Sequence, residues 1–464
     1  MSGDASQDYL AEGITEAITA DLAKFRSLRV VSRTSAMQYS ARTKSLREIA
    51  RELHVDAIVE GGMVRSGEHV RVTARLIRAA DDQQIWAGSY DRELRDVLAL
   101  QNDVAGDIAE HVRAQITAAD RQRLATARVL NPAAHEEYLK GRFFWNKRTE
   151  NGYTDAIEHF DRAIKMDPNY PEPWAGMADA YALLGSLGGA SVSRREAMNK
   201  ARTVARKALE LDPSSAEAHT SLAFVLMHYD WDFAAAEQEF LRAIELNPSY
   251  ATAHQWHAIN LAATGQIDAA LAELQRAQEL DPLSLIIGAD IGEFLGLARR
   301  YEEAAAQLQN TLKMDPHFLL AHVNLADVYN YEGEYTEAEK HALEALVIDA
   351  NSMWAKGVVA TCYALEGQKG KARTMMRGMQ RSARGGEIGH HFASVSVALG
   401  EKDAAFHWLQ VAYENREGSL ILLRIIPYYD PLRSDPRFIK LLQRIESKPA
   451  QARIGASDQI PLTP

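Results

Sequence analysis

The chain has 464 residues, which is too long for one ordinary core and predicts several domains or one extended repeat array. Its 52 basic and 63 acidic side chains give a net charge of −11, which argues against nucleic acid or an anionic membrane as partner. The one cysteine, Cys362, excludes an internal disulfide and a cysteine-rich metal site. Because there is neither a signal-peptide pattern nor an apolar run of about 18 residues, we expect a cytoplasmic protein without a membrane segment.

The first part of the chain, residues 1–119, predicts a small α/β domain. Helical patterns cover residues 5–25, 45–54 and 97–116, and β-rich runs cover residues 28–33, 56–65, 69–79 and 83–94. In the third run Val70, Val72 and Ala74 alternate with polar residues, so one face of that strand is expected to meet water. The last three runs are expected to form a meander.

The sequence of this region is similar to that of the TolB-like amino-terminal domain, which precedes tetratricopeptide arrays in bacterial signalling proteins. The resemblance runs from "SGDASQDYLAEGITEAITADLAKF" to "QQIWAGSYDREL". It implies a position after an effector module such as a winged-helix domain, a nucleotide cyclase or a kinase. Members normally open with an apolar strand ending in Leu-Pro-Phe, which is missing before the Ser-Gly-Asp segment. We therefore expect an upstream segment, or else a sheet edge left open for another chain.

The rest of the chain repeats one ending, as in "AIEHFDRAIKMDP", "FLRAIELNP" and "LQRAQELDP". The closing residues Pro168, Pro213, Pro248, Pro282 and Pro316 follow one another at 45, 35, 34 and 34 residues. Pairs of alanines seven residues apart, two helical turns, lie before these prolines and allow close helix packing. A period of 34 residues predicts stacked helix–turn–helix units, because one helix pair cannot bury its own apolar face.

The first helix of each unit carries its own pattern, as in "AHVNLADVYNYEG" and "PWAGMADAYALLG". These residues resemble the tetratricopeptide repeat, and the resemblance implies a right-handed α-solenoid. We count eight units between about Ala134 and Asn415, with inserts in the first two units and weaker endings in units six and seven. The fold class expected is therefore mostly α, with the solenoid preceded by the small α/β domain.

The domain boundaries follow from these patterns. We expect the TolB-like domain at 1–119, a linker helix at 120–133, the array with its capping helix at 134–446, and a disordered tail at 447–464. The cap is predicted from Ser434 or Asp435 as N-cap, Pro436 at the first helical position, and an apolar stripe from Phe438 to Ile445.

We expect the histidines and the cysteine to have structural roles. His219, His254 and His322 occupy one repeat position, where the repeat often has Trp, so their spacing is not that of metal ligands. The adjacent pair His390 and His391 lacks a third ligand. No nucleophile elbow, phosphate-binding loop, kinase signature or cyclase signature is present. We therefore expect no enzyme activity, no cofactor and no metal.

A stack of helix pairs offers a concave groove lined by its first helices. As a set, the groove positions predict an acidic, partly aromatic surface suited to a peptide with basic and apolar side chains. Placing the units on the repeat frame puts these residues in the groove: Glu172, Asp179, Thr220, Phe224, Met227, His228, Gln255, Ile259, Glu293, Asp327, Asn330 and Tyr331.

Together these patterns predict a non-enzymatic interaction scaffold or sensory module that binds a protein or peptide in the groove. The alternative is a regulatory remnant of an adenylate cyclase or of a winged-helix regulator whose effector lies upstream or was lost. An upstream membrane segment would change the expected compartment to the periplasm.

Overall fold

The computed structural model describes residues 8–25, 27–39, 44–67, 69–93, 96–112, 131–187, 192–382 and 388–447. Most of the predicted linker helix and the predicted disordered tail lie outside these residues, as do parts of the second and seventh units. Within them, no helix is both long enough and apolar enough to span a bilayer. The domain boundaries given above stay a prediction.

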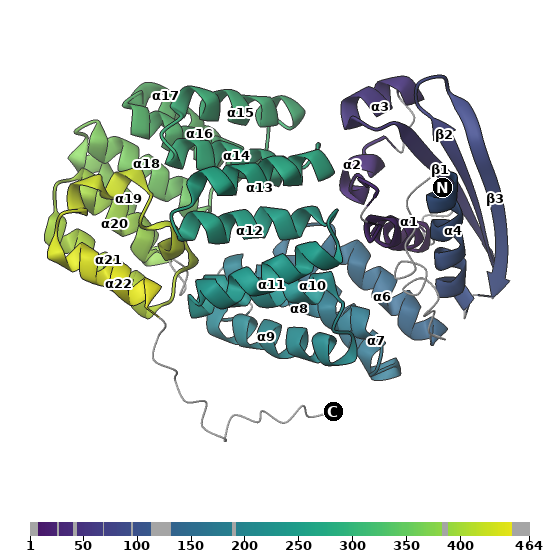
Figure 1. Ribbon diagram of the computed structural model, residues 1–464. Coiled ribbons are helices and arrows are strands. Elements are labelled where there is room, and N and C mark those ends of the chain that lie inside the picture. Colours follow the sequence, from purple (N-terminus) through teal and green to yellow (C-terminus); the bar gives the residue numbers. More distant parts are fainter. Residues whose placement is uncertain are drawn as a thin grey trace.

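The N-terminal module places helices on one face of a small sheet (Figure 1). The order is α1 (Asp8–Ala23), α2 (Arg33–Met37), α3 (Leu46–Leu53), β1 (Ala57–Ser66), β2 (His69–Arg78), β3 (Gln83–Glu93) and α4 (Val97–His111). The three strands form an antiparallel meander, β1-β2-β3, with Val72 opposite Met63 and Tyr90. Val70, Val72 and Ala74 are buried while Arg71, Thr73 and Arg75 are exposed, so the predicted alternation is confirmed.

The strand predicted at residues 28–33 is wrong. Residues 28–32 are irregular and α2 begins at Arg33. Their polar groups bond to the repeat array instead of a sheet: the backbone N–H of Ser32 donates to the carbonyl of Leu280 at 2.8 Å, and the Arg29 guanidinium donates to the carbonyl of Glu279 at 2.7 Å. Local β propensity is overridden by these tertiary contacts.

Eight helix pairs follow and stack into an α-solenoid (Figure 1). The pairs are α6 (Pro132–Trp145) with α7 (Glu150–Met166), α8 (Pro171–Leu187) with α9 (Arg194–Leu211), α10 (Ala216–Val225) and its π-helical turn η3 (Leu226–Asp230) with α11 (Phe233–Leu246), α12 (Ala251–Ala263) with α13 (Ile267–Leu280), α14 (Leu285–Leu297) with α15 (Tyr301–Met314), α16 (Leu319–Glu332) with α17 (Tyr335–Ile348), α18 (Met353–Leu365) with α19 (Lys369–Ser382), and α20 (Gly389–Ala398) with α21 (Lys402–Glu414). The 3-10 turns η4 (Gly418–Leu422) and η5 (Pro427–Leu432) then lead to α22 (Pro436–Glu446).

One interaction recurs at four of the junctions between units. The indole N–H of Trp174 donates to the carbonyl of Pro168 at 3.1 Å, six residues earlier. The Nε2 atoms of His219, His254 and His322 make the same contact with the carbonyls of the prolines six residues before them, at 3.0 to 3.1 Å. Each ring thus satisfies a carbonyl at the end of the preceding unit. These histidines stand where the repeat often has tryptophan. In the described residues, no group of three or more His, Cys, Asp or Glu side chains could hold a metal ion.

The turn between the two helices of a unit also recurs. A residue with left-handed backbone stands at positions 231, 265, 299, 333 and 367, which are 34 residues apart. Glycine fills three of these positions and adopts this conformation without strain. Behind the turns, Ala236, Ala243, Ala270 and Ala277 are fully buried, as their spacing predicted.

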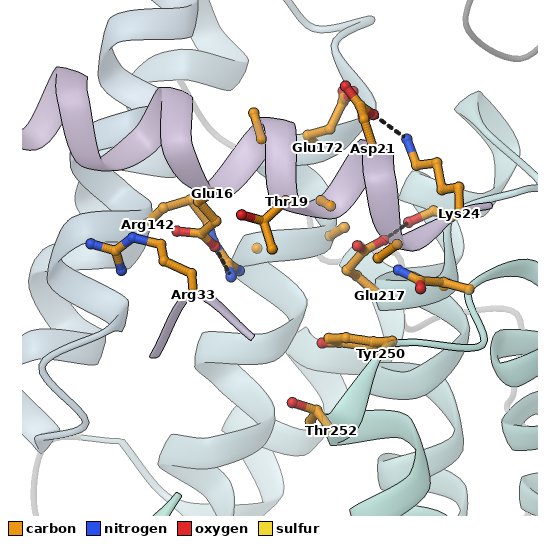
Figure 2. A pocket seen from close by; sticks show the side chains of 18 of the residues that line it. Glu16, Thr19, Asp21, Lys24, Arg33, Arg142, Glu172, Glu217, Tyr250 and Thr252 are labelled. Atoms are coloured by element: carbon orange, nitrogen blue, oxygen red, sulfur yellow. Dashed lines mark hydrogen bonds and ion pairs between the residues drawn. The ribbon is translucent and has the colours of Figure 1, made fainter. Parts of the chain in front are cut away.

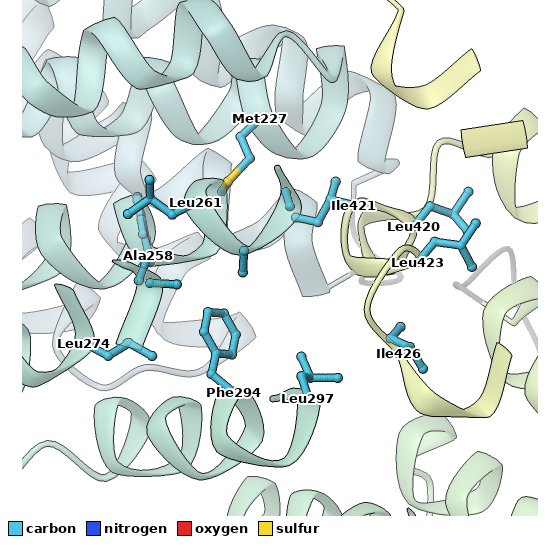
Figure 3. Packing of buried hydrophobic residues seen from close by; sticks show 14 of the residues in the cluster. Met227, Ala258, Leu261, Leu274, Phe294, Leu297, Leu420, Ile421, Leu423 and Ile426 are labelled. Atoms are coloured by element: carbon cyan, nitrogen blue, oxygen red, sulfur yellow. The ribbon is translucent and has the colours of Figure 1, made fainter. Parts of the chain in front are cut away.

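The array core depends on large side chains between those alanines. Leu274 is fully buried between units four and five (Figure 3). We expect Leu274→Ala to lower the free energy of unfolding by about 2–5 kcal/mol, because it removes buried methyl groups and leaves a cavity. The measurement is urea unfolding followed by circular dichroism at the helical band. The control is Leu241→Ala, a residue 51% exposed, which should change stability by less than about 0.5 kcal/mol. Equal effects of the two substitutions would contradict this packing.

Candidate functional site

The concave face of the array carries the candidate site, and two segments of the same chain lie against it. The N-terminal module covers the first units, where the Arg142 guanidinium on α6 donates to the Glu16 carboxylate on α1 at 2.7 Å. Asn146 donates to the other oxygen of Glu16 at 3.2 Å. Further along, the hydroxyl of Ser35 donates to the buried carboxylate of Asp281 at 2.5 Å. These contacts join residues that lie far apart in the sequence.

A cavity of about 560 Å³ remains between α1 and the first helices of the array. Figure 2 shows Thr19 on α1 and Lys24 directly after it, facing Glu172 on α8 and Glu217 on α10. The ring of Tyr250, which precedes α12, lies below Glu217 in this view. Desolvation by the surrounding protein raises the pKa of Glu172 to about 7, although the residue is exposed at the surface of the cavity, and the nearby carboxylates of Asp212 and Glu217 act in the same direction. The cavity therefore combines a polar lining with a carboxylate whose pKa is raised.

The second half of the concave face is filled by residues 416–432, which we call the groove segment. Its apolar residues Leu420, Ile421, Leu423 and Ile426 are buried in one cluster with the side chains of the array (Figure 3). On the array side, the cluster includes these residues: Met227, Ala258, Leu261, Phe294 and Leu297. The groove segment thus takes the place that a bound peptide would take in this part of the array.

Polar contacts fix the groove segment at Tyr428. Its hydroxyl donates to Asp327 Oδ1 at 2.6 Å and accepts from Asn330 Nδ2 at 3.1 Å. Its ring meets Tyr331 edge-on, with the centroids 4.7 Å apart. At the other end, the Arg416 guanidinium donates to the carbonyl of Tyr229 at 2.8 Å and lies over the Trp231 ring. Aromatic, apolar and basic side chains therefore occupy this face.

The predicted groove residues other than Glu293 divide into three groups. Asp327, Asn330 and Tyr331 contact Tyr428, and Met227 packs with the segment's apolar side chains. Glu172 instead lines the cavity beside α1.

The other predicted residues make contacts within the array. Asp179 is 1% exposed and accepts a hydrogen bond from Ser221, Thr220 bonds the carbonyl of Ala216, and Gln255 bonds Asp290. Phe224 stacks on His228 and lies against Trp256, and Ile259 packs against the core cluster. The partner-binding role of the whole set stays a prediction.

Three carboxylates lie close together where the groove segment crosses units five and six. Burial raises the pKa of Asp290 and of Asp327 to about 7, although each accepts a hydrogen bond. Burial, together with the negative charges of Asp290 and Asp327, raises the pKa of Glu293 to about 8. Among the described residues, Glu293 forms no hydrogen bond or ion pair through its side chain. Near neutral pH this cluster resists full ionisation.

Two site features were missed in the sequence. Glu217 lies 45 residues after Glu172, the same interval that separates Pro213 from Pro168, so the repeat frame could have placed it beside Glu172. Tyr428 follows no periodic pattern, and no sequence signal pointed to its contact with Asp327 about 100 residues earlier.

Known proteins and families resemble parts of the chain. The family models "TPR repeat" and "Tetratricopeptide repeat" match residues 148–185 and 298–352. A putative adenylate cyclase 3 from Rhizobium meliloti is 30% identical over 49% of this chain and 38% of its own length. The transcriptional regulator HilA of Salmonella typhimurium is 23% identical over 53% of this chain and 43% of its own length. The chain therefore spans less than half the length of both curated relatives.

Solved structures agree on the fold. A human IFIT1 dimer with m7Gppp-AAAA has a TM-score of 0.50 and 15% identity, covering 93% of this chain and 95% of that one. At this identity the likeness shows the fold alone. The chain contains tetratricopeptide repeats, and proteins built from such repeats are typically non-enzymatic scaffolds for protein interactions.

The raised pKa of Glu293 predicts a pH-dependent stability. Below the unfolded pKa of about 4.3 the group is protonated in both states, and it opposes folding increasingly as pH rises towards its folded pKa of about 8. Glu293→Gln should therefore match wild type near pH 4 and be more stable by about 1–3 kcal/mol near pH 8.5. Urea midpoints at both pH values measure this, with Glu302→Gln, an exposed residue, as control. A variant no more stable than wild type at the higher pH would contradict it.

Proposed function

We propose that the protein is a non-enzymatic interaction module that captures a segment of a partner protein on the concave face of units three to six. The partner segment binds there in exchange with the chain's own groove segment. The observation that carries this proposal is the anchoring of Tyr428 by Asp327, Asn330 and Tyr331, three of the predicted groove residues.

The groove segment indicates the chemistry that a partner needs. A tyrosine hydroxyl pairs with a carboxylate that burial makes hard to ionise, and the Tyr428 bond at 2.6 Å lowers the cost of that burial. The neighbouring apolar side chains remove water from the face, which strengthens the bond. A partner segment with an aromatic residue, several aliphatic residues and one basic residue fits the same contacts.

The intramolecular arrangement controls access to the face. The groove segment is joined directly to α21 and α22, so its effective concentration at the face is high. A partner must either bind more tightly or meet a chain in which the segment has been released. The module then reports a partner through a change in the position of its own C-terminal region.

The test asks whether the groove segment, added as a separate peptide, can replace the segment of the chain itself. A labelled synthetic peptide of residues 416–432 should bind the Tyr428→Ala protein saturably, and at least about tenfold more tightly than it binds wild type, because the resident segment is weakened. Fluorescence polarisation measures the affinity. The same peptide with Ala in place of Tyr428 should bind weakly, and Ile439→Ala, an exposed residue on α22, should behave as wild type.

Two results would contradict this proposal. One is that the peptide fails to bind the Tyr428→Ala protein, and the other is that it binds both proteins with the same affinity. Where exchange occurs, partners recovered from a bacterial lysate by the Tyr428→Ala protein should be displaced by the wild-type peptide and not by its Ala version.

A second candidate is a regulatory part of a longer signalling protein. It is favoured by the relatives, a putative adenylate cyclase and a transcriptional regulator, of which this chain matches 38% and 43% of the length. A cyclase or DNA-binding signature in the same reading frame upstream of Met1 would support this candidate. A stop codon in frame immediately before Met1 would count against it.

A further inference from the structure

The cavity beside α1 is lined by charged residues of both signs. Among the residues that line it are six carboxylates (Glu16, Asp21, Glu172, Asp212, Glu217 and Asp281) and four cations (Lys24, Arg33, Arg142 and Arg148). The lining therefore carries two more acidic than basic groups. A partly enclosed space with this imbalance attracts positive charge.

Two of the six carboxylates form ion pairs, Glu16 with Arg142 and Asp21 with Lys24. Asp212 accepts from the Ser214 hydroxyl and Asp281 from the Ser35 hydroxyl. In the described part of the chain, Asp212, Asp281, Glu172 and Glu217 form no ion pair, although Lys24 lies close enough to influence Glu172 and Glu217. A cationic ligand can still neutralise these four carboxylates, of which Glu172 and Glu217 are the two near Lys24.

The repeat frame explains why these two acids face each other. Positions 172, 217 and 252 are equivalent, since they are separated by the same 45 and 35 residues as the closing prolines. Glu172 and Glu217 begin α8 and α10, and Thr252 begins α12, so the three lie along one edge of the array. The next two equivalent positions hold Ile286 and Leu320. The acids thus occur only in units that face α1.

Two buried polar groups stand in the wall of the same cavity. His135 is 2% exposed; its Nδ1 meets the Tyr170 hydroxyl at 2.8 Å, but its Nε2 has no partner. Trp145 is 4% exposed and has an indole N–H without a partner. Buried polar atoms in proteins are nearly always hydrogen-bonded, so these two are exceptions, although each has almost no accessible surface. A cavity of about 560 Å³ has the size of a small-molecule site.

We propose that this cavity binds a small organic cation, with Glu172 and Glu217 as charge partners for an ammonium or guanidinium group. Tyr250 and Thr252 line the same cavity, and their hydroxyls accept further N–H groups. Because the cavity is bounded by α1 on one side and by the array on the other, the ligand stabilises the contact between the N-terminal module and the first units. The same chemistry can come from a free polyamine or from a lysine side chain of a peptide.

Calorimetric titration and thermal unfolding with spermidine, and separately with a short lysine peptide, test this proposal. We expect saturable binding of one probe and a higher unfolding temperature. Glu172→Gln/Glu217→Gln should weaken that binding at least about tenfold. The matched control, Glu302→Gln, also removes a carboxylate from the start of a helix but lies outside the cavity. It should bind as wild type does, and circular dichroism establishes that each variant is folded.

The two probes separate the sources of the cation. Tighter binding of spermidine assigns the site to a free polyamine, and tighter binding of the peptide assigns it to a lysine side chain. Equal affinity of wild type and the double variant, or no saturable binding of either probe, would overturn the proposal. The Tyr428→Ala protein leaves the cavity intact and should bind the probe normally, so this test and the exchange test can fail separately.

Discussion

The concave face of the repeat stack is the surface on which the rest of the structure depends. Helix pairs bury their apolar sides against one another, and the first helices present a curved face on which other segments can bind. The chain covers parts of this face twice with its own residues. Residues 8–25 and 27–35 lie over the first units, and residues 416–432 lie over the later ones. The array, the N-terminal module and the C-terminal region are therefore one connected system.

The array surface under the groove segment differs from the array surface beside α1. Under the groove segment, Asp327 is partly buried and bonded to a tyrosine, while Glu293 has no side-chain partner in the described residues. Beside α1, Glu172 and Glu217 line a cavity large enough for a ligand. In both places desolvation raises the pKa of a carboxylate, so charge on the concave face can respond to what binds there. This connection gives a physical route from binding to a change in how the segments are held.

Local signals in the sequence predicted the array well, and long-range contacts account for what they missed. Proline, glycine and alanine at fixed intervals specify helix pairs, since each acts within one unit. The β-rich residues 28–33 were misread because their partners, at Leu280 and Glu279, lie about 250 residues away. For the same reason Asp327 was placed in the groove from its repeat position, whereas its contact with Tyr428 had no periodic signal.

Hydrogen–deuterium exchange of wild type and the Tyr428→Ala protein tests the central claim, that the chain's own segment covers the array. The account predicts slow exchange of residues 418–432 in wild type, with faster exchange in the variant both there and in α16, while α9 is unchanged. Exchange of residues 418–432 in wild type as fast as that of a free peptide would contradict it.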